Sequence, residues 1–208
     1  MKPQGGRGKY NIEVALEKAI HNLAAKNPRE VSVNSGINFN RESKEYLVPF
    51  LGSRFFVHHE TGKVTSAASK EEAPLHTRLL ILHYLYTANG RPLAGEWITF
   101  KELPGGQIYV KPYTNRAIRP LEKAFGSRPD RLLTAAAKLG GKEGNFGDFC
   151  AVLQVLPRVP MAFVLWEGDE EFPPRGNILY DANASCYLPT EDYALLPGIV
   201  IGELLKQL

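Results

Sequence analysis

Two apolar runs in the second half of the chain place the strongest constraint on the fold. Asp148 to Leu156 and Val159 to Trp166 each have the length of a β-strand and carry apolar side chains at both odd and even positions. The turn Pro157-Arg-Val-Pro160 links them. Strands that are apolar on both faces lie inside a sheet whose faces are covered. The two runs therefore predict strands in the middle of a sheet flanked by helices.

Ala73 to Asn89 is predicted to be a central buried helix. Pro74 is tolerated in its first turn, Gly90 follows its end, and residues 79–86 are apolar nearly all the way round. His83 lies on this helix. A hydrogen-bonded histidine at the edge of the core is the simpler interpretation, and a proton carrier is the alternative.

The remaining pattern alternates short strands with helices. Three runs predict a small meander: Tyr46 to Phe50, Arg54 to Glu60 and Lys63 to Ser66. Further helices are predicted over Tyr10 to Lys26, Asn115 to Phe125 and Pro129 to Leu139, with a last helix capped by Pro189-Thr-Glu-Asp192. We expect an α+β fold in a single domain over residues 10–208, with a mainly antiparallel sheet flanked by helices. Residues 1–9 are predicted to be a flexible, basic tip.

A hairpin is predicted from Glu96 to Lys111 around Leu103-Pro-Gly-Gly106. On its first strand, Trp97 and Lys101 share one face. An odd loop count would place Tyr109 on that face as well, giving an aromatic and basic surface, whereas an even count would give a core face. The sequence leaves both registers open.

Charge, length and cysteine content exclude several classes of protein. The formal net charge of +3 is accounted for by Lys2, Arg7 and Lys9, so the rest of the chain is balanced and nucleic-acid binding is not expected. No run reaches the roughly 18 to 20 apolar residues of a membrane span, and a cytoplasmic protein is expected. Cys150 and Cys186 lie outside any CxxC pattern, which favours buried thiols.

Acidic and basic residues are separated along the second half of the chain. Residues 166–192 contain seven carboxylates and one base, Arg175, whereas residues 101–142 contain nine bases and three acids. The two segments could neutralise each other or lie on solvated faces. Alternatively, they could border an anion-binding cleft.

The first functional hypothesis is a binding module at one end of the sheet. Trp97, Tyr109 and Trp166 would form its walls, with the acidic loop and the basic helices at its rim, around a polar cofactor or metabolite. The alternative for both tryptophans is packing in the core. The candidate ligand-binding residues are His83, Trp97, Lys101, Tyr109, Trp166, Asp169, Glu171 and Asp181.

Two further hypotheses use the charged segments. Asp169, Glu171 and Asp181 could bind a hard cation such as magnesium, or could divide acid and base roles in an enzyme. No serine or cysteine nucleophile lies in an elbow motif, and the acid spacing matches no calcium loop. The third hypothesis is a docking surface for a protein partner, recognised by complementary charge.

Six motifs in order resemble a known prokaryotic family. They are residues 83–90 (HYLYTANG), 93–100 (LAGEWITF), 103–106 (LPGG), 156–160 (LPRVP), 166–172 (WEGDEEF) and 178–192 (ILYDANASCYLPTED). Together they resemble the family catalogued as domain of unknown function 3786, over about residues 10–208. The family has no established activity. The resemblance implies a context of anaerobic bacteria and archaea and of corrinoid one-carbon metabolism. A corrinoid or pterin-like ligand would suit that context, and the cofactor is otherwise unknown. Some relatives carry a Cys-rich iron-sulfur segment, which this chain lacks.

Overall fold

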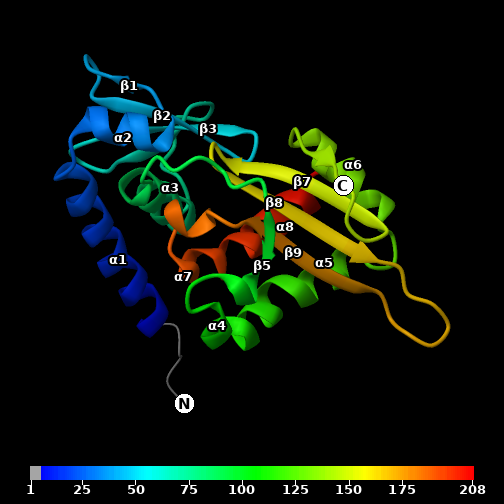
Figure 1. The fold of residues 1–208 in the computed structure, drawn as a ribbon. Helices are drawn as coiled ribbons and strands as arrows, with labels where there is room; N and C mark the ends of the chain where they lie inside the picture. Colours follow the sequence, from blue (N-terminus) through cyan, green and yellow to red (C-terminus); the bar gives the residue numbers. More distant parts are fainter. Residues whose placement is uncertain (1–5) are drawn as a thin grey trace. The chain divides into compact units, whose positions relative to one another are not determined.

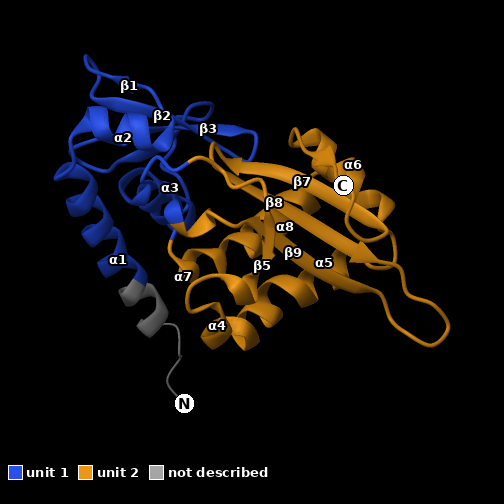
Figure 2. Ribbon diagram, in the orientation of Figure 1, with its two compact units in different colours: residues 1–91, 186–188 blue, residues 92–185, 189–208 orange. Residues whose placement is uncertain are grey.

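The computed structural model describes the backbone of residues 6–208 and the side chains of residues 12–208 (Figure 1). The predicted flexible tip, residues 1–9, lies outside the residues whose side chains are described. The chain divides into two compact units, shown in blue and orange in Figure 2. Unit 1 comprises residues 1–91 and 186–188, and unit 2 comprises residues 92–185 and 189–208.

Unit 1 combines three helices with a four-stranded antiparallel sheet. Its elements are α1 (Gly6–Ala24), α2 (Pro28–Ser35), β1 (Phe39–Asn40), β2 (Glu45–Phe50), β3 (Ser53–His58), β4 (Val64–Ser66) and α3 (Leu75–Thr87). The strands follow one another in chain order across the sheet. The predicted meander is therefore confirmed, and β1 adds a short edge strand to it.

Helix α3 forms the core of unit 1. Residues Leu79 to Leu82 are buried, and α1 packs against this helix. The buried Tyr84 hydroxyl donates a hydrogen bond of 2.6 Å to the carbonyl oxygen of Ser35. The Tyr84 ring stacks on Tyr187, with ring centroids 6.1 Å apart. The prediction of a buried central helix is confirmed.

Helix α2 was not expected from the sequence. The sequence predicts a first helix that ends at Lys26, and the pair Asn27-Pro28 directly after it begins a second helix. The Asn27 side chain accepts a hydrogen bond from the Arg29 backbone N–H, and Pro28 occupies the first turn. Gly36, with a φ of 73°, ends the helix in the left-handed conformation.

Unit 2 is built on a five-stranded antiparallel sheet in the order β5-β9-β8-β7-β6. Its strands are β5 (Trp97–Thr99), β6 (Lys142–Glu143), β7 (Phe149–Leu156), β8 (Val159–Trp166) and β9 (Arg175–Asp181). Its helical elements are η1 (Phe100–Glu102), α4 (Gly106–Tyr113), η2 (Thr114–Ile118), α5 (Arg119–Phe125), α6 (Asp130–Lys138), α7 (Thr190–Tyr193) and α8 (Leu196–Leu205), and η3 (Ala184–Cys186) crosses into unit 1. The two long apolar runs, β7 and β8, are inner strands of the sheet as predicted.

Helices α5, α6 and α8 pack on one another and form a layer on the sheet of unit 2. Within this layer α5 contacts β9 and α6 contacts β7. Aromatic side chains fill the space near β9, where Phe100 stacks on Tyr113 with ring centroids 3.9 Å apart. The Tyr180 hydroxyl donates to the Tyr113 hydroxyl at 3.2 Å. Helices flanking antiparallel sheets confirm the predicted α+β class.

The predicted hairpin between Glu96 and Lys111 is wrong. Residues 107–111 lie in α4, and β5 pairs with β9 instead, with Trp97 opposite Asp181. Gly105 has a φ of 71°, and a Cβ on Gly106 would lie 2.1 Å from the carbonyl oxygen of Phe100. Such a close approach of the backbone requires glycine. The Leu-Pro-Gly-Gly turn therefore starts a helix, and neither of the two hairpin registers applies.

Candidate functional site

The two tryptophans predicted to wall one site lie at opposite ends of β9. Trp166 of β8 is opposite Arg175, and Trp97 of β5 is opposite Asp181. The six residue steps from Arg175 to Asp181 along β9 span roughly 20 Å. Trp97 packs against an apolar cluster around Cys150 and Val164, whereas Trp166 is 40% exposed. They do not line one pocket.

The three candidate carboxylates are likewise separated. Asp169 lies in the exposed β8–β9 loop, where its Oδ1 accepts the backbone N–H groups of Glu171 and Phe172 at 2.8 and 2.7 Å. These bonds hold the pKa of Asp169 below its ordinary value. Asp181 is buried at the far end of β9. Nowhere in the described part of the chain do three or more His, Cys, Asp or Glu side chains group so that they could hold a metal ion.

The other candidates occupy separate elements. Tyr109 of α4 donates a 3.0 Å hydrogen bond to Glu191, and this bond raises the pKa of the phenol. Lys101 is exposed in η1. His83 belongs to α3 of unit 1 and meets Tyr86 edge-on, with ring centroids 5.5 Å apart. The candidates of unit 2 therefore lie on separate elements, and His83 belongs to unit 1.

Among the described residues, the acids of the β8–β9 loop form no ion pair with the basic segment. Arg128, in the basic segment, pairs with Asp130 of the same segment at 3.2 Å. Arg175 lies 5.8 Å from the Phe172 ring centroid. The side chains of the acidic loop are solvated.

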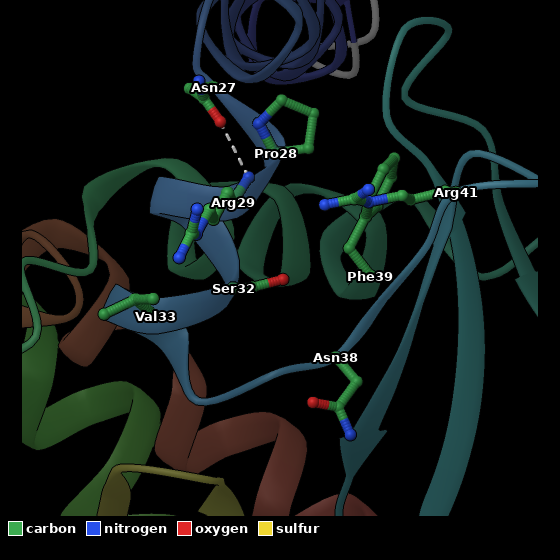
Figure 3. A pocket seen from close by; sticks show the side chains of 8 residues that line it. All are labelled: Asn27, Pro28, Arg29, Ser32, Val33, Asn38, Phe39 and Arg41. Atoms are coloured by element: carbon green, nitrogen blue, oxygen red, sulfur yellow. Dashed lines mark hydrogen bonds between the residues drawn. The ribbon is translucent and has the colours of Figure 1, made fainter.

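A hollow lined by several polar groups lies between α2 and β1 of unit 1 (Figure 3). Its volume is about 520 Å³. The lining residues are Asn27, Pro28, Arg29, Ser32, Val33, Asn38, Phe39 and Arg41. They come from fifteen consecutive positions, because α2, the turn at Gly36 and β1 fold the chain back on itself. We call this hollow the α2 pocket.

The α2 pocket is electropositive. Arg29 and Arg41 line it, and no acid does. Arg41 extends from the turn after β1 toward α2 (Figure 3). Neither guanidinium takes part in an ion pair with another described residue. Both charges are therefore available to an anion.

Neutral donors accompany the two arginines. Ser32 Oγ is buried and has no hydrogen-bond partner among the described residues. Figure 3 shows this hydroxyl pointing from α2 into the space faced by Arg41 and Phe39. A buried hydroxyl without a partner is costly, so a ligand atom that bonded to it would recover that cost. The pocket also lies beside the first turn of α2, where the helix dipole favours negative charge.

One wall of the α2 pocket is aromatic and uncharged. The Phe39 ring lies 4.9 Å from the Tyr46 ring centroid and 5.8 Å from that of His59. Burial lowers the pKa of His59, which therefore stays neutral near pH 7. The positive field in the pocket thus originates from the arginines.

Sequence reasoning missed this site, although one signal was present. Asn27-Pro28 followed by Arg29 and Glu30 fits an N-cap and first-turn proline as well as it fits a helix end. Had α2 been predicted, Arg29 and Ser32 would have shared a helix face by their spacing of three. Nothing in the local sequence places Arg41 beside them, since that requires β1 to pair with β2.

Comparison with known proteins identifies a family. The family model described as "Domain of unknown function (DUF3786)" matches residues 27–203. The chain belongs to this family, as the resemblance predicted. No curated protein and no solved structure matches the chain. None of the helices within the described residues has the length and apolarity needed to cross a membrane.

Proposed function

We propose that this member of the DUF3786 family binds a small ligand through an anionic group held in the α2 pocket. One observation carries the proposal: Arg41 extends into a hollow that contains the partnerless Ser32 hydroxyl and no acid. Binding sites for small molecules are concave and carry a few convergent polar groups, with volumes of about 300 to 1,000 Å³. The α2 pocket has these properties.

The chemistry of the lining selects a carboxylate or a phosphate. A guanidinium presents paired N–H donors that match two oxygens of either group. Arg29 would add charge at the rim, Ser32 can donate its hydroxyl hydrogen, and Asn38 can donate or accept. The ligand is thus held by charge and hydrogen bonds on one side and by Phe39 on the other.

A role as an accessory protein in anaerobic one-carbon or corrinoid metabolism is the context that the family resemblance implies, with the cytoplasm as the expected location. In that role, the α2 pocket would bind an anionic group of the ligand. A corrinoid or pterin ligand would have to present such a group to Arg41. This context is best tested by including both cofactor types in the ligand screen.

The two alternative functions have less support. An enzyme using Asp169, Glu171 and Asp181 would need them at one place, and β9 separates them. A charge-driven docking module would use the solvated acids of the β8–β9 loop beside the exposed Phe172 and Trp166. Ligand binding is the stronger proposal, because the α2 pocket combines a hollow with a buried hydroxyl that lacks a described partner.

Isothermal titration with inorganic phosphate, acetate, a pterin carboxylate and a corrinoid tests the proposal. We expect Arg41→Gln to weaken anion binding about tenfold or more, and the double variant Arg29→Gln with Arg41→Gln to weaken it further. Arg54→Gln removes an exposed arginine of β3 outside the pocket and serves as the charge-matched control. Failure of every anion to bind, or equal binding by Arg41→Gln and the control, would overturn the proposal.

A further inference from the structure

The α2 pocket is much larger than the anionic group that its arginines would hold. Its volume is about 520 Å³. A carboxylate or phosphate group has the size of a few water molecules, each of which takes up about 30 Å³ in the liquid. A ligand that fills the pocket therefore has a further part besides its anionic group.

The rest of the lining consists of neutral groups. Besides Arg29 and Arg41, the pocket is lined by Asn27, Pro28, Ser32, Val33, Asn38 and Phe39. A cationic group on the ligand would be repelled by the two arginines and would find no acid among these residues. The further part of the ligand therefore contacts amides and apolar side chains, of which Phe39 has the largest surface.

Phe39 presents a fixed, flat surface to the pocket. It lies directly opposite Tyr46 in the pairing of β1 with β2. Its ring centroid is 4.9 Å from that of Tyr46 and 5.8 Å from that of His59. Those two rings are buried, whereas Phe39 is only partly buried and lines the pocket. The Phe39 ring is thus held from the core and remains accessible from the pocket.

The ring of Phe39 lies near the groups that would bind the anion. Figure 3 shows Phe39 and Arg41 facing the same space beside α2, with the Ser32 hydroxyl on the other side of that space. Only Asn40 separates Phe39 from Arg41 in the chain. A ligand bound to Arg41 and Ser32 can therefore reach the Phe39 ring without a long linker.

We infer that the ligand is an aromatic anion: Arg41 and Ser32 bind its carboxylate or phosphate, and its planar ring packs against Phe39. A planar ring gains more from this wall than an aliphatic body of the same size, because aromatic pairs interact favourably beyond the area that they bury. This inference rests on the proposed function and adds the class of ligand.

Probe pairs of matched size separate ring packing from the burial of apolar area. Isothermal titration compares benzoate with cyclohexanecarboxylate, and phenyl phosphate with cyclohexyl phosphate. The saturated rings are at least as apolar as the planar ones, so burial of area alone would not favour the planar probes. We expect benzoate and phenyl phosphate to bind about two- to tenfold more tightly than their saturated partners.

Phe39→Leu is the matched variant, because leucine keeps an apolar side chain and removes the ring. Phe172→Leu removes an exposed ring from unit 2 and serves as its control. We expect Phe39→Leu to abolish the preference for the planar probes while it leaves the affinity for acetate and inorganic phosphate unchanged. Phe172→Leu should change neither quantity.

The outcomes distinguish this inference from the proposed function. Equal or tighter binding of the saturated probes by the wild-type protein, or a planar preference that survives in Phe39→Leu, would overturn the inference and leave the proposed function standing. Binding of benzoate and phenyl phosphate that is indifferent to Arg29→Gln with Arg41→Gln would overturn the proposed function, and the inference with it.

Discussion

Tyr46 Oη lies 3.0 Å from Nδ1 of His59, and both side chains are buried beneath Phe39. Burial is the largest influence on the imidazole and lowers its pKa. The Glu60 carboxylate and a hydrogen bond with the Lys26 backbone oppose that shift, and the neighbouring His58 adds to it. Burial also raises the pKa of Tyr46 above its ordinary value. The Tyr46 phenol and the His59 imidazole are therefore both uncharged near pH 7.

This pair predicts a loss of stability in mild acid. His59 in the unfolded chain takes up a proton near pH 6.5, whereas the folded protein resists protonation to a lower pH. Below about pH 6.5 the unfolded state therefore binds more protons than the folded state, and the free energy of unfolding decreases as the pH is lowered. Above that pH, His59 contributes no dependence of stability on pH. Urea unfolding at pH 7.5 and pH 5.5 measures the difference.

His59→Gln should lower the stability at pH 7.5 but flatten its dependence on pH between 5.5 and 7.5. His76→Gln is the control, because His76 is exposed on α3 and its replacement should leave the pH dependence unchanged. If the wild-type slope survived in His59→Gln, another group would be responsible.

Asp181 is predicted to be a structural carboxylate. Its buried oxygens accept the backbone N–H groups of Ala94, Gly95 and Asn183 at 2.9, 2.9 and 2.8 Å. Asp181→Ala would leave these donors without their partner, which costs roughly 3 kcal/mol of unfolding free energy. Denaturant titration measures the loss. Asp169→Ala, which removes an acceptor from an exposed turn, should cost less than about 1 kcal/mol.

If Asp181→Ala proved as mild as Asp169→Ala, the loop from Ala94 to Gly95 would not depend on this carboxylate. The earlier hypotheses for Asp181, cation binding or an acid or base role, would then have to be considered again. A large cost confined to stability, with anion affinity unchanged, would separate Asp181 from the binding site.

The turn between β3 and β4 approaches α1 so closely that only glycine fits at position 62. Gly62 has a φ of +62°, and a Cβ there would lie 2.4 Å from Cγ1 of Ile20. Gly105, with a φ of +71°, has nothing within 4 Å of the equivalent position. Gly105→Ala should therefore cost only the backbone strain, about 1 to 2 kcal/mol. Gly62→Ala should cost at least about 1 kcal/mol more, since the added methyl also clashes. Thermal unfolding of the two variants provides the comparison, and equal losses would show that α1 yields to the added methyl.

Strong periodic patterns determined which parts of the fold were predictable. The helix around Leu80 and the strands β7 and β8 have long, unambiguous apolar patterns, and their assignment is confirmed. Residues 107–111 have a short pattern that fits either a strand or a helix turn. There the turn brings the backbone of Gly106 close to the Phe100 carbonyl oxygen, which the apolar pattern does not record.

The site was less accessible to prediction than the fold. Acids are concentrated in residues 166–192, but β9 comprises seven of these residues and carries Asp181, its one acid, away from Asp169. The α2 pocket depends instead on an eight-residue helix that begins only four residues after the end of α1. Its charge is only two arginines, too few to mark the segment in composition. Proximity of Arg41 to Ser32 follows from strand pairing between β1 and β2, which no local pattern of the sequence specifies.

The two cysteines should differ in reactivity. Cys150 is buried in the sheet of unit 2, and burial raises the pKa of its thiol, so little of the reactive thiolate is present near pH 8. Cys186 is only partly buried. Titration of the native protein with a thiol-specific disulfide reagent should therefore give one fast equivalent, assigned to Cys186, and a second that appears only on denaturation. Cys186→Ser should abolish the fast phase, and Cys150→Ser should retain it. Rapid modification of both thiols in the native state would mean that the sheet around Cys150 opens far more readily than its complete burial suggests.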